Sequence, residues 1–127
     1  MAKILLCDDS KSILLLFDRK LGAAGHEIVG KAKDGFECAK LFSETSCDLV
    51  LLDITMPNRD GRECLEDLLK INPHAKVIMV SALQEAEVVS KCISAGAKGF
   101  VSKASLYDDG EFKSQVLGLI ENVLKAA

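Results

Sequence analysis

Three aspartates stand at the carboxyl ends of two apolar runs in the sequence. Asp8 and Asp9 follow the run 4–7, and Asp53 follows the run 49–52. Two like charges at about 4 Å repel by roughly 4 kcal/mol at the effective dielectric near a protein surface, so carboxylates that gather there attract a cation. Oxygen ligands suit Mg²⁺, which keeps several waters and often shares its site with phosphate. The residue types therefore indicate a magnesium site.

Whether these carboxylates meet depends on the elements that carry them. Short apolar or β-branched runs predict strands at 3–7, 27–32, 49–53, 76–81 and 99–101. Helical patterns follow the strands at 11–24, 36–44, 62–71, 86–95 and 112–126. Strands that alternate with helices are typical of a parallel α/β sheet, and unbroken apolar runs indicate strands covered on both faces. We predict an α/β fold with a five-stranded parallel sheet flanked by five helices, and we take the flavodoxin-like order 2-1-3-4-5 as the known topology of such a sheet.

The spacing of turn residues is consistent with one compact unit. Asp34-Gly35 and the stretch 56–61 predict turns, because Gly and Asn tolerate positive φ and Pro57 presets a negative φ. The 127 residues, of which 49% are apolar, contain no internal repeat and no low-complexity run. We therefore expect residues 1–127 to form a single domain without an output domain.

Composition argues against several classes of partner. The net charge is −3 and the sixteen Lys and Arg residues are dispersed, which argues against nucleic-acid binding. No apolar run approaches about eighteen residues and no targeting peptide is visible, so we expect a cytoplasmic protein without membrane contact. The five cysteines form no CxxC pair and are odd in number. We expect packing cysteines, with neither a disulfide framework nor a zinc site.

Topology predicts where the polar strand ends meet. An open parallel sheet binds ligands outside the carboxyl ends of its strands, where the strand order reverses. In the order 2-1-3-4-5 this point lies between the first and third strands, which end in Asp8-Asp9 and Asp53. Ser81 ends the fourth strand and Lys103 closely follows the fifth, adding a hydroxyl and a cation. Together these groups could hold a phosphoryl group.

At this point the sequence resembles a known family, the receiver domains of two-component response regulators, of the CheY-like single-domain type. The resemblance spans nearly the whole chain. Each motif is weak alone, but their order is specific. The motifs are Asp8-Asp9-Ser10, Asp53-Ile54-Thr55-Met56-Pro57 with Gly61, Ser81-Ala82, Ala95-Gly96-Ala97 and Phe100-Val101-Ser102-Lys103.

The resemblance implies a role for each acidic residue. Asp53 would accept a phosphoryl group from a sensor histidine kinase. Asp9 would ligate Mg²⁺ directly, Asp8 would act partly through metal-bound water, and Asp53 and the carbonyl oxygen of Thr55 would complete the metal site. The metal would offset charge on the transferring group. The chain would not be an enzyme in the ordinary sense, because it would assist only its own phosphorylation and dephosphorylation.

The resemblance also implies how the signal leaves the site. Lys103 and Ser81 would contact phosphoryl oxygens, and Phe100 would move into the space that the Ser81 hydroxyl vacates. A Phe cannot make the outward hydrogen bond of a Tyr at this position. The face of the fourth helix, fifth strand and fifth helix would then bind a partner protein, in chemotaxis a flagellar motor switch. Thr55 and Leu83 would flank the water that hydrolyses the phosphoryl bond.

Two departures and three alternatives accompany this interpretation. Ala104 stands where receivers usually place a proline, and the acidic link 105–111 looks longer than usual. The chain could instead be a phosphorelay intermediate that passes its phosphoryl group to a phosphotransfer protein, or a degenerate receiver that acts without phosphorylation. Phosphatases of the haloacid dehalogenase type also use an aspartate nucleophile and Mg²⁺. They need a second aspartate where Thr55 stands and a cap domain that does not fit this length.

Overall fold

The computed structural model describes residues 2–82 and 86–126, and one five-stranded sheet lies at its centre. Neighbouring strands are parallel in the order β2-β1-β3-β4-β5, which confirms the prediction. Cys7 lies beside Leu52, so the residues that follow β1 and β3 emerge at the same edge. The strands are β1 (Lys3–Cys7), β2 (Glu27–Ala32), β3 (Leu49–Asp53), β4 (Val77–Ser81) and β5 (Gly99–Ser102).

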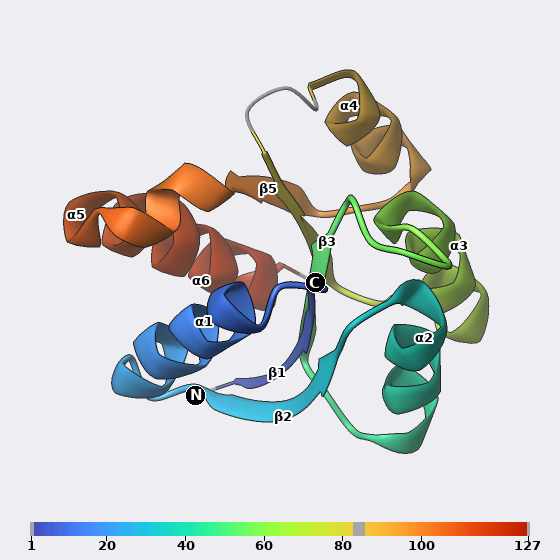
Figure 1. Cartoon of the computed structure of the whole chain (residues 1–127), viewed down its shortest axis with the longest axis horizontal. Coiled ribbons are helices and arrows are strands. Elements are labelled where there is room, and N and C mark those ends of the chain that lie inside the picture. The colour runs from blue at the N-terminus through green and yellow to red at the C-terminus, as the bar shows by residue number, and fades with distance from the viewer. Residues whose placement is uncertain (1, 83–85, 127) are drawn as a thin grey trace.

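Helices cover both faces of the sheet, as Figure 1 shows. α1 and the C-terminal helical region lie on one face, and α2, α3 and α4 lie on the other. In the described residues, no helix is long and apolar enough to cross a membrane. The bounds of the first four helices are α1 (Lys11–Ala23), α2 (Gly35–Glu44), α3 (Gly61–Ile71) and α4 (Ala86–Ala95).

Alternate strand residues point into two separate cores. Leu6 of β1 belongs to the same core as Phe17 of α1, whereas its neighbour Leu5 belongs to the core that contains Leu65 of α3. All four side chains are fully or almost fully buried. A sheet covered on both faces needs apolar residues at consecutive positions. This arrangement accounts for the unbroken apolar runs in the sequence.

The C-terminal helical region starts earlier than predicted. It begins at Asp109 rather than Phe112, because the side chain of Asp108 accepts the backbone N–H of Glu111 at 2.9 Å and caps the first turn. The acidic link is therefore shorter than it looked. The region runs without a break through α5 (Asp109–Glu111), the π-helical segment η2 (Phe112–Leu117) and α6 (Gly118–Lys125), and the 3₁₀ helix η1 (Lys103–Tyr107) joins it to β5.

Two cysteines depart from the expectation of simple packing. Cys7 at the end of β1 and Cys38 in α2 are joined as a disulfide, although they lie 31 residues apart in the sequence. Both side chains are buried in the core beneath α2 and α3. The expectation of cysteines that only pack in the core therefore misses this pair, because the β1–α1–β2 crossover returns α2 to the face toward which Cys7 points.

Candidate functional site

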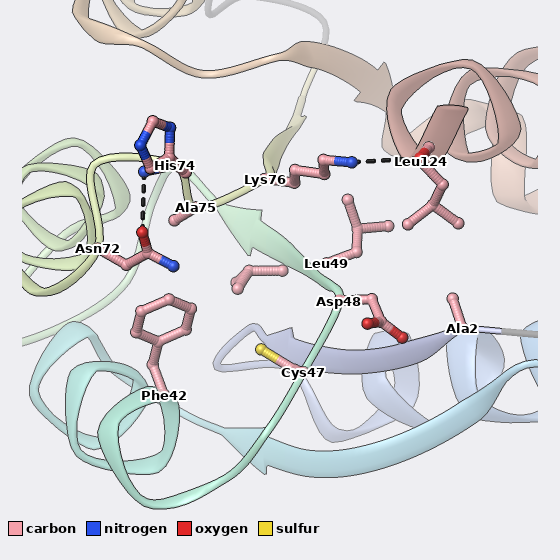
Figure 2. Close-up of a pocket in the computed structure, with 11 residues that line it drawn as sticks. Ala2, Phe42, Cys47, Asp48, Leu49, Asn72, His74, Ala75, Lys76 and Leu124 are labelled. Atoms are coloured by element: carbon pink, nitrogen blue, oxygen red, sulfur yellow. Dashed lines mark hydrogen bonds between the residues drawn. The ribbon is translucent and has the colours of Figure 1, made fainter. Parts of the chain in front are cut away.

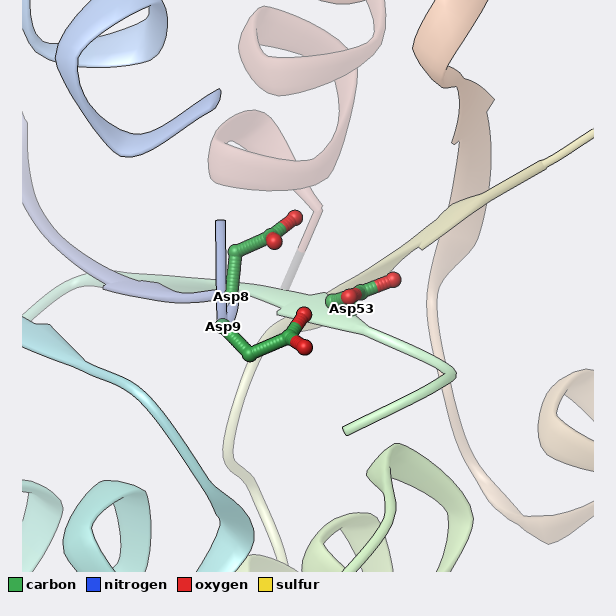
Figure 3. Close-up of side chains that lie close together, drawn as sticks. All are labelled: Asp8, Asp9 and Asp53. Atoms are coloured by element: carbon green, nitrogen blue, oxygen red, sulfur yellow. The ribbon is translucent and has the colours of Figure 1, made fainter. Parts of the chain in front are cut away.

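The three predicted aspartates form one cluster at the carboxyl edge of the sheet. Asp8 and Asp9 come from the end of β1, and Asp53 is the last residue of β3. One carboxylate oxygen from each lies within 4.8 Å of the others, and Figure 3 shows the three side chains gathered at one place. Asp8 and Asp53 are 2% and 1% exposed, whereas Asp9 is open to solvent. The cluster therefore combines two buried carboxylates with one accessible one.

The start of α1 holds the first two aspartates in place. Asp8 Oδ1 accepts the backbone N–H of Ser10 at 2.9 Å, and the Ser10 hydroxyl accepts the backbone N–H of Ile13 at 3.3 Å. Ser10 is thus the N-cap of α1. Because Ser10 caps the helix, the carboxylate of Asp9 is available to the acidic cluster.

A cation directly after β5 lies beside the carboxylates. Lys103 Nζ lies 3.2 Å from Asp53 Oδ1 and 3.4 Å from Asp8 Oδ2. Lys103 makes these contacts although Ala104 replaces the usual proline. The peptide bond between Lys103 and Ala104 is trans, since the described residues contain no cis peptide bond. Ser81 is 5% exposed and ends β4, where it pairs with Ser102. The structure thus places the predicted hydroxyl and ammonium groups on the same edge as the carboxylates.

Burial and like charge make the central carboxylate hard to ionise. Burial, together with the neighbouring charge of Asp8, raises the pKa of Asp53 to about 7, although Lys103 opposes the shift. Burial also raises the pKa of Asp8 against the opposing effects of the Ser10 N–H and Lys103. A group with a perturbed pKa in a charged cluster is a candidate for chemistry. Additional positive charge would favour both ionised carboxylates.

Several carboxylate oxygens in the cluster lack a hydrogen-bond donor. Asp8 Oδ2 and both side-chain oxygens of Asp53 are buried and accept no hydrogen bond from residues 2–82 or 86–126. Lys103 reaches two of these oxygens only as an ion pair. Leaving such groups unsatisfied is costly. A hard divalent cation would satisfy them, so the residues present fit Mg²⁺.

The β3–α3 loop, residues 54–60, carries the fourth predicted metal ligand. Thr55 lies exposed in this loop, two positions after Asp53. The backbone N–H of Gly61 donates to the carbonyl oxygen of Ile54 at 2.8 Å and closes the base of the loop. A side chain at Gly61 would collide with the backbone carbonyl of Asp53. Glycine is therefore required for the loop to turn this close to Asp53.

Two of the predicted switch residues, Ser81 and Phe100, border an apolar hollow between β5 and α4. The hollow has a volume of about 510 Å³, and its lining includes Ser81, Val89, Ile93 and Phe100. Phe100 is 53% exposed and Ile93 is 40% exposed. The hollow therefore connects the end of β4 at the acidic cluster to an exposed aromatic side chain. Leu83, the predicted neighbour of the hydrolytic water, lies outside the described residues.

A second cavity, of about 590 Å³, lies at the amino edge of the sheet, away from the aspartates (Figure 2). Three of its polar side chains already have partners. Asp48 accepts the backbone N–H of Lys3 at 2.8 Å, and Asn72 accepts that of His74 at 2.9 Å. Lys76 Nζ donates to the carbonyl oxygens of Leu124 and Ala126 at 3.2 and 3.0 Å. Size alone does not make this cavity a functional site.

Sequence reasoning missed the contacts that anchor the β3–α3 loop. The carbonyl oxygen of Arg59 and the side chain of Asp34 both accept hydrogen bonds that join this loop to the start of α2. From the sequence, the Asp34-Gly35 pair predicts only a turn. A glycine directly after a capping aspartate was the available signal. Its meaning depends on which segment lies opposite, and a single sequence does not specify that.

Comparisons with known proteins agree with this geometry. The family model for the response regulator receiver domain matches residues 4–114. Protein CcdB of Bacillus subtilis is 39% identical over 103 residues, which cover 81% of this chain and 86% of that protein. Chemotaxis protein CheY of Thermotoga maritima is 35% identical over 101 residues, covering 80% and 84%. The solved CheX-CheY-BeF3-Mg+2 complex from Borrelia burgdorferi contains a similar fold, with a TM-score of 0.84, 30% identity, and coverage of 98% of this chain and 90% of that one.

Proposed function

Because the chain belongs to the response regulator receiver domain family of two-component signalling, we propose that it is a phosphorylation-dependent switch whose acceptor is Asp53. Receiver domains bind Mg²⁺ at an acidic pocket and take phosphate from histidine kinases. One observation carries the assignment to Asp53: both of its oxygens are buried without a hydrogen-bond donor in the described residues, beside Asp8, Asp9 and Lys103.

Asp53 acts in this proposal as the nucleophile. A bond forms between one Asp53 oxygen and the phosphorus atom while the bond from phosphorus to the donor imidazole nitrogen breaks. The imidazole keeps the electron pair and later takes up a proton. Lys103, at 3.2 Å from Asp53, stabilises the ionised carboxylate before transfer and a phosphoryl oxygen afterwards. Positioning and electrostatics supply the rate.

The metal would be held by Asp8, Asp9, Asp53 and the carbonyl oxygen of Thr55. When bound, Mg²⁺ supplies positive charge against the oxygens of the transferring group, which is the main need of a loose transition state. Asp9 is the exposed member of the cluster and gives the ion an entry path. Receiver domains are signalling proteins rather than classical enzymes, and this chain would assist only its own phosphorylation and dephosphorylation.

The phosphoryl group would change the distant face through Ser81 and Lys103. A phosphoryl oxygen attracts the Ser81 hydroxyl, and the half-exposed ring of Phe100 can then enter the hollow that both residues line. Phosphorylation thereby shifts the population of two conformations. The face of α4, β5 and the C-terminal helical region would bind a downstream protein, such as a flagellar motor switch or a phosphotransfer protein.

The lifetime of the signal would depend on access of water to the phosphorus atom. Thr55 is exposed beside the cluster, and Leu83 follows Ser81 by two positions. We propose that these two side chains flank the approaching water. A leucine has no donor or acceptor with which to orient water, so spontaneous hydrolysis would be governed largely by Thr55.

Intact-mass spectrometry tests the acceptor assignment. An acyl phosphate with Mg²⁺ is expected to add one base-labile phosphoryl group to the wild-type chain and none to Asp53→Asn. Asp48→Asn is the matched control, because Asp48 lies at the opposite edge of the sheet and an amide oxygen can still accept the Lys3 N–H. Full labelling of Asp53→Asn would place the nucleophile elsewhere. A wild-type chain that binds Mg²⁺ but takes no label would be a degenerate receiver.

A retention experiment tests the output. The domain is immobilised with and without beryllofluoride, which mimics phosphorylated Asp53, and proteins retained from the source lysate are identified by mass spectrometry. A partner retained only with the adduct supports a phosphorylation-dependent face, and Phe100→Ala is expected to weaken that retention. An identical retained set under both conditions would contradict the switch.

A further inference from the structure

The first turn of α2 is bonded directly to the β3–α3 loop. The backbone N–H of Gly35 donates to the carbonyl oxygen of Arg59 at 2.9 Å. One position earlier, Asp34 Oδ2 accepts the side-chain amide of Asn58 at 3.0 Å. Figure 1 shows the loop passing close to the start of α2 on its way to α3. Two segments far apart in sequence are thus joined through both main-chain and side-chain groups.

The side chain of Arg59 strengthens this junction. Its guanidinium donates to both oxygens of Asp67 in α3, at 2.6 and 3.0 Å, and lies 3.3 Å from Glu63. Hydrogen bonding to Arg59 holds the pKa of Asp67 below its usual value. The guanidinium carbon also lies 5.7 Å from the centre of the Phe36 ring in α2. A bidentate pair on one side and an aromatic ring on the other fix the direction of Arg59.

Gly35 makes the close approach possible. A Cβ added to Gly35 would lie 2.5 Å from the Arg59 carbonyl oxygen and 2.9 Å from Arg59 Cβ. The first of these neighbours is backbone, so the loop itself would have to move. Asn58 adopts a φ of 67°, a left-handed conformation that Asn tolerates better than most residues. The tip of the loop therefore depends on particular residues on both sides of the junction.

The junction lies on the same loop as Thr55. At its base the loop is held by the Gly61–Ile54 bond of 2.8 Å and by the Ile54 N–H, which donates to Val80 in β4 at 3.1 Å. With the base held by β4 and the tip held by α2, the backbone at Thr55 has little freedom to move away from Asp53. Mg²⁺ demands near-octahedral geometry at short distances, so a displaced carbonyl is a poor ligand.

We propose that the first turn of α2, through Asp34 and Gly35, is a positioning element that sets the Mg²⁺ affinity of the acidic cluster by fixing the loop that carries Thr55. This inference rests on the proposed function, in which the Thr55 carbonyl is a ligand. No residue of α2 would be a ligand of the metal. They act through the loop, as outer groups that orient metal ligands do in other sites.

A pair of glycine substitutions tests the proposal in the whole chain. Gly35→Ala is expected to weaken Mg²⁺ binding about tenfold, measured by titration of amide NMR shifts with MgCl₂. The control is Gly22→Ala in α1, where no described atom outside the local helix lies within 4 Å of the added Cβ. Gly22→Ala should bind Mg²⁺ as the wild type does. Equal affinities for the two variants would overturn the proposal.

A second variant keeps the test decisive if Gly35→Ala does not fold. Asn58→Gly permits the same left-handed backbone, but it removes the hydrogen bond to Asp34 and frees the backbone at the loop tip, so Mg²⁺ affinity should fall about fivefold. Wild-type affinity in this variant would count against the proposal. The Mg²⁺ concentration for half-maximal labelling by an acyl phosphate should rise in the same proportion, while the rate at saturating Mg²⁺ stays near wild type. If the junction only stabilised the fold, the variant would unfold more easily, but the Mg²⁺ concentration for half-maximal labelling would stay the same.

The Asp9→Ala variant distinguishes a failure of the proposed function from a failure of the role proposed for α2. If the wild type does not bind Mg²⁺, or if Asp9→Ala binds it equally well, the proposed function itself fails. If Asp9→Ala loses binding while Gly35→Ala and Asn58→Gly keep it, only the role of α2 is wrong.

Discussion

The two edges of the sheet differ in how their charged groups are satisfied. At the amino edge a cavity of about 590 Å³ is lined by Asp48, Asn72 and Lys76, each of which has a hydrogen-bond partner. At the carboxyl edge Asp8 and Asp53 are buried and keep oxygens without donors in the described part of the chain. The comparison teaches that unsatisfied buried charge, rather than hollow volume, marks the place where a cation and a phosphoryl group would bind.

The largest expected effect comes from removing the accessible carboxylate of the carboxyl edge. Asp9→Ala should lower Mg²⁺ affinity by about 100-fold, because a direct ligand is lost, whereas Asp48→Asn at the amino edge should leave it unchanged. Titration of amide NMR shifts with MgCl₂ measures both. Similar losses in the two variants would mean that overall negative charge attracts the ion, and the difference between the edges would disappear.

A smaller effect is expected from the cation of the carboxyl edge. Lys103→Ala should still bind Mg²⁺ and take some label, but the amide shifts of β5 should respond less to beryllofluoride because the link from Asp53 to β5 is gone. Lys98→Ala is the control, since Lys98 is exposed just before β5. A full β5 response in Lys103→Ala would show that the signal leaves the site by another route.

The smallest effect concerns hydrolysis. Leu83→Gln should change the rate at which phosphorylated protein decays by a few-fold, about the effect of one added hydrogen bond. Tyr107→Ala, which alters an exposed ring on η1, should not change that rate. The loss of the phosphorylated mass species after donor removal gives both half-lives. Equal half-lives would show that Leu83 does not control water access.

Sequence patterns predicted the features that depend on residues close together in the chain, such as the strands and helices. The apolar runs and their spacing predicted alternating strands and helices, and the family resemblance supplied the strand order that brings Asp8 and Asp53 together. The Cys7–Cys38 bond and the Arg59 junction were not predicted, because each joins segments whose facing side chains depend on how α2 packs. A periodic pattern shows which face of an element is buried but not which residue lies opposite.

The start of the last helix shows a different reason for a missed prediction. Asp108 caps that helix, but it stands within an acidic stretch in which any of several residues could have served as the cap. The apolar pattern alone placed the start at Phe112, the first residue of the region that is buried. Capping residues are recognised reliably only when the first turn is known.

The pH dependence of stability follows from the raised pKa of Asp53. With a pKa of about 7, Asp53 would keep its proton in the folded chain up to about pH 7, whereas an ordinary aspartate, with a pKa of 3.8, loses it far below that pH. The free energy of unfolding therefore falls as pH rises from 3.8 to about 7. Above about pH 7 the folded chain carries the whole cost of an ionised, buried Asp53. Asp53→Asn removes that cost, so without Mg²⁺ it should be more stable than the wild type at pH 8 and similar to it near pH 4.

Urea unfolding of the wild type and Asp53→Asn at pH 8, with and without MgCl₂, tests the central claim most directly. Without the metal, Asp53→Asn should be more stable by about 2 kcal/mol, because each unit of pKa shift corresponds to about 1.4 kcal/mol and solvent relaxation reduces the full amount. Added Mg²⁺ should stabilise the wild type by mass action and the variant much less, which narrows or reverses the difference. A variant that is no more stable than the wild type without Mg²⁺, or that gains as much from it, would contradict the account.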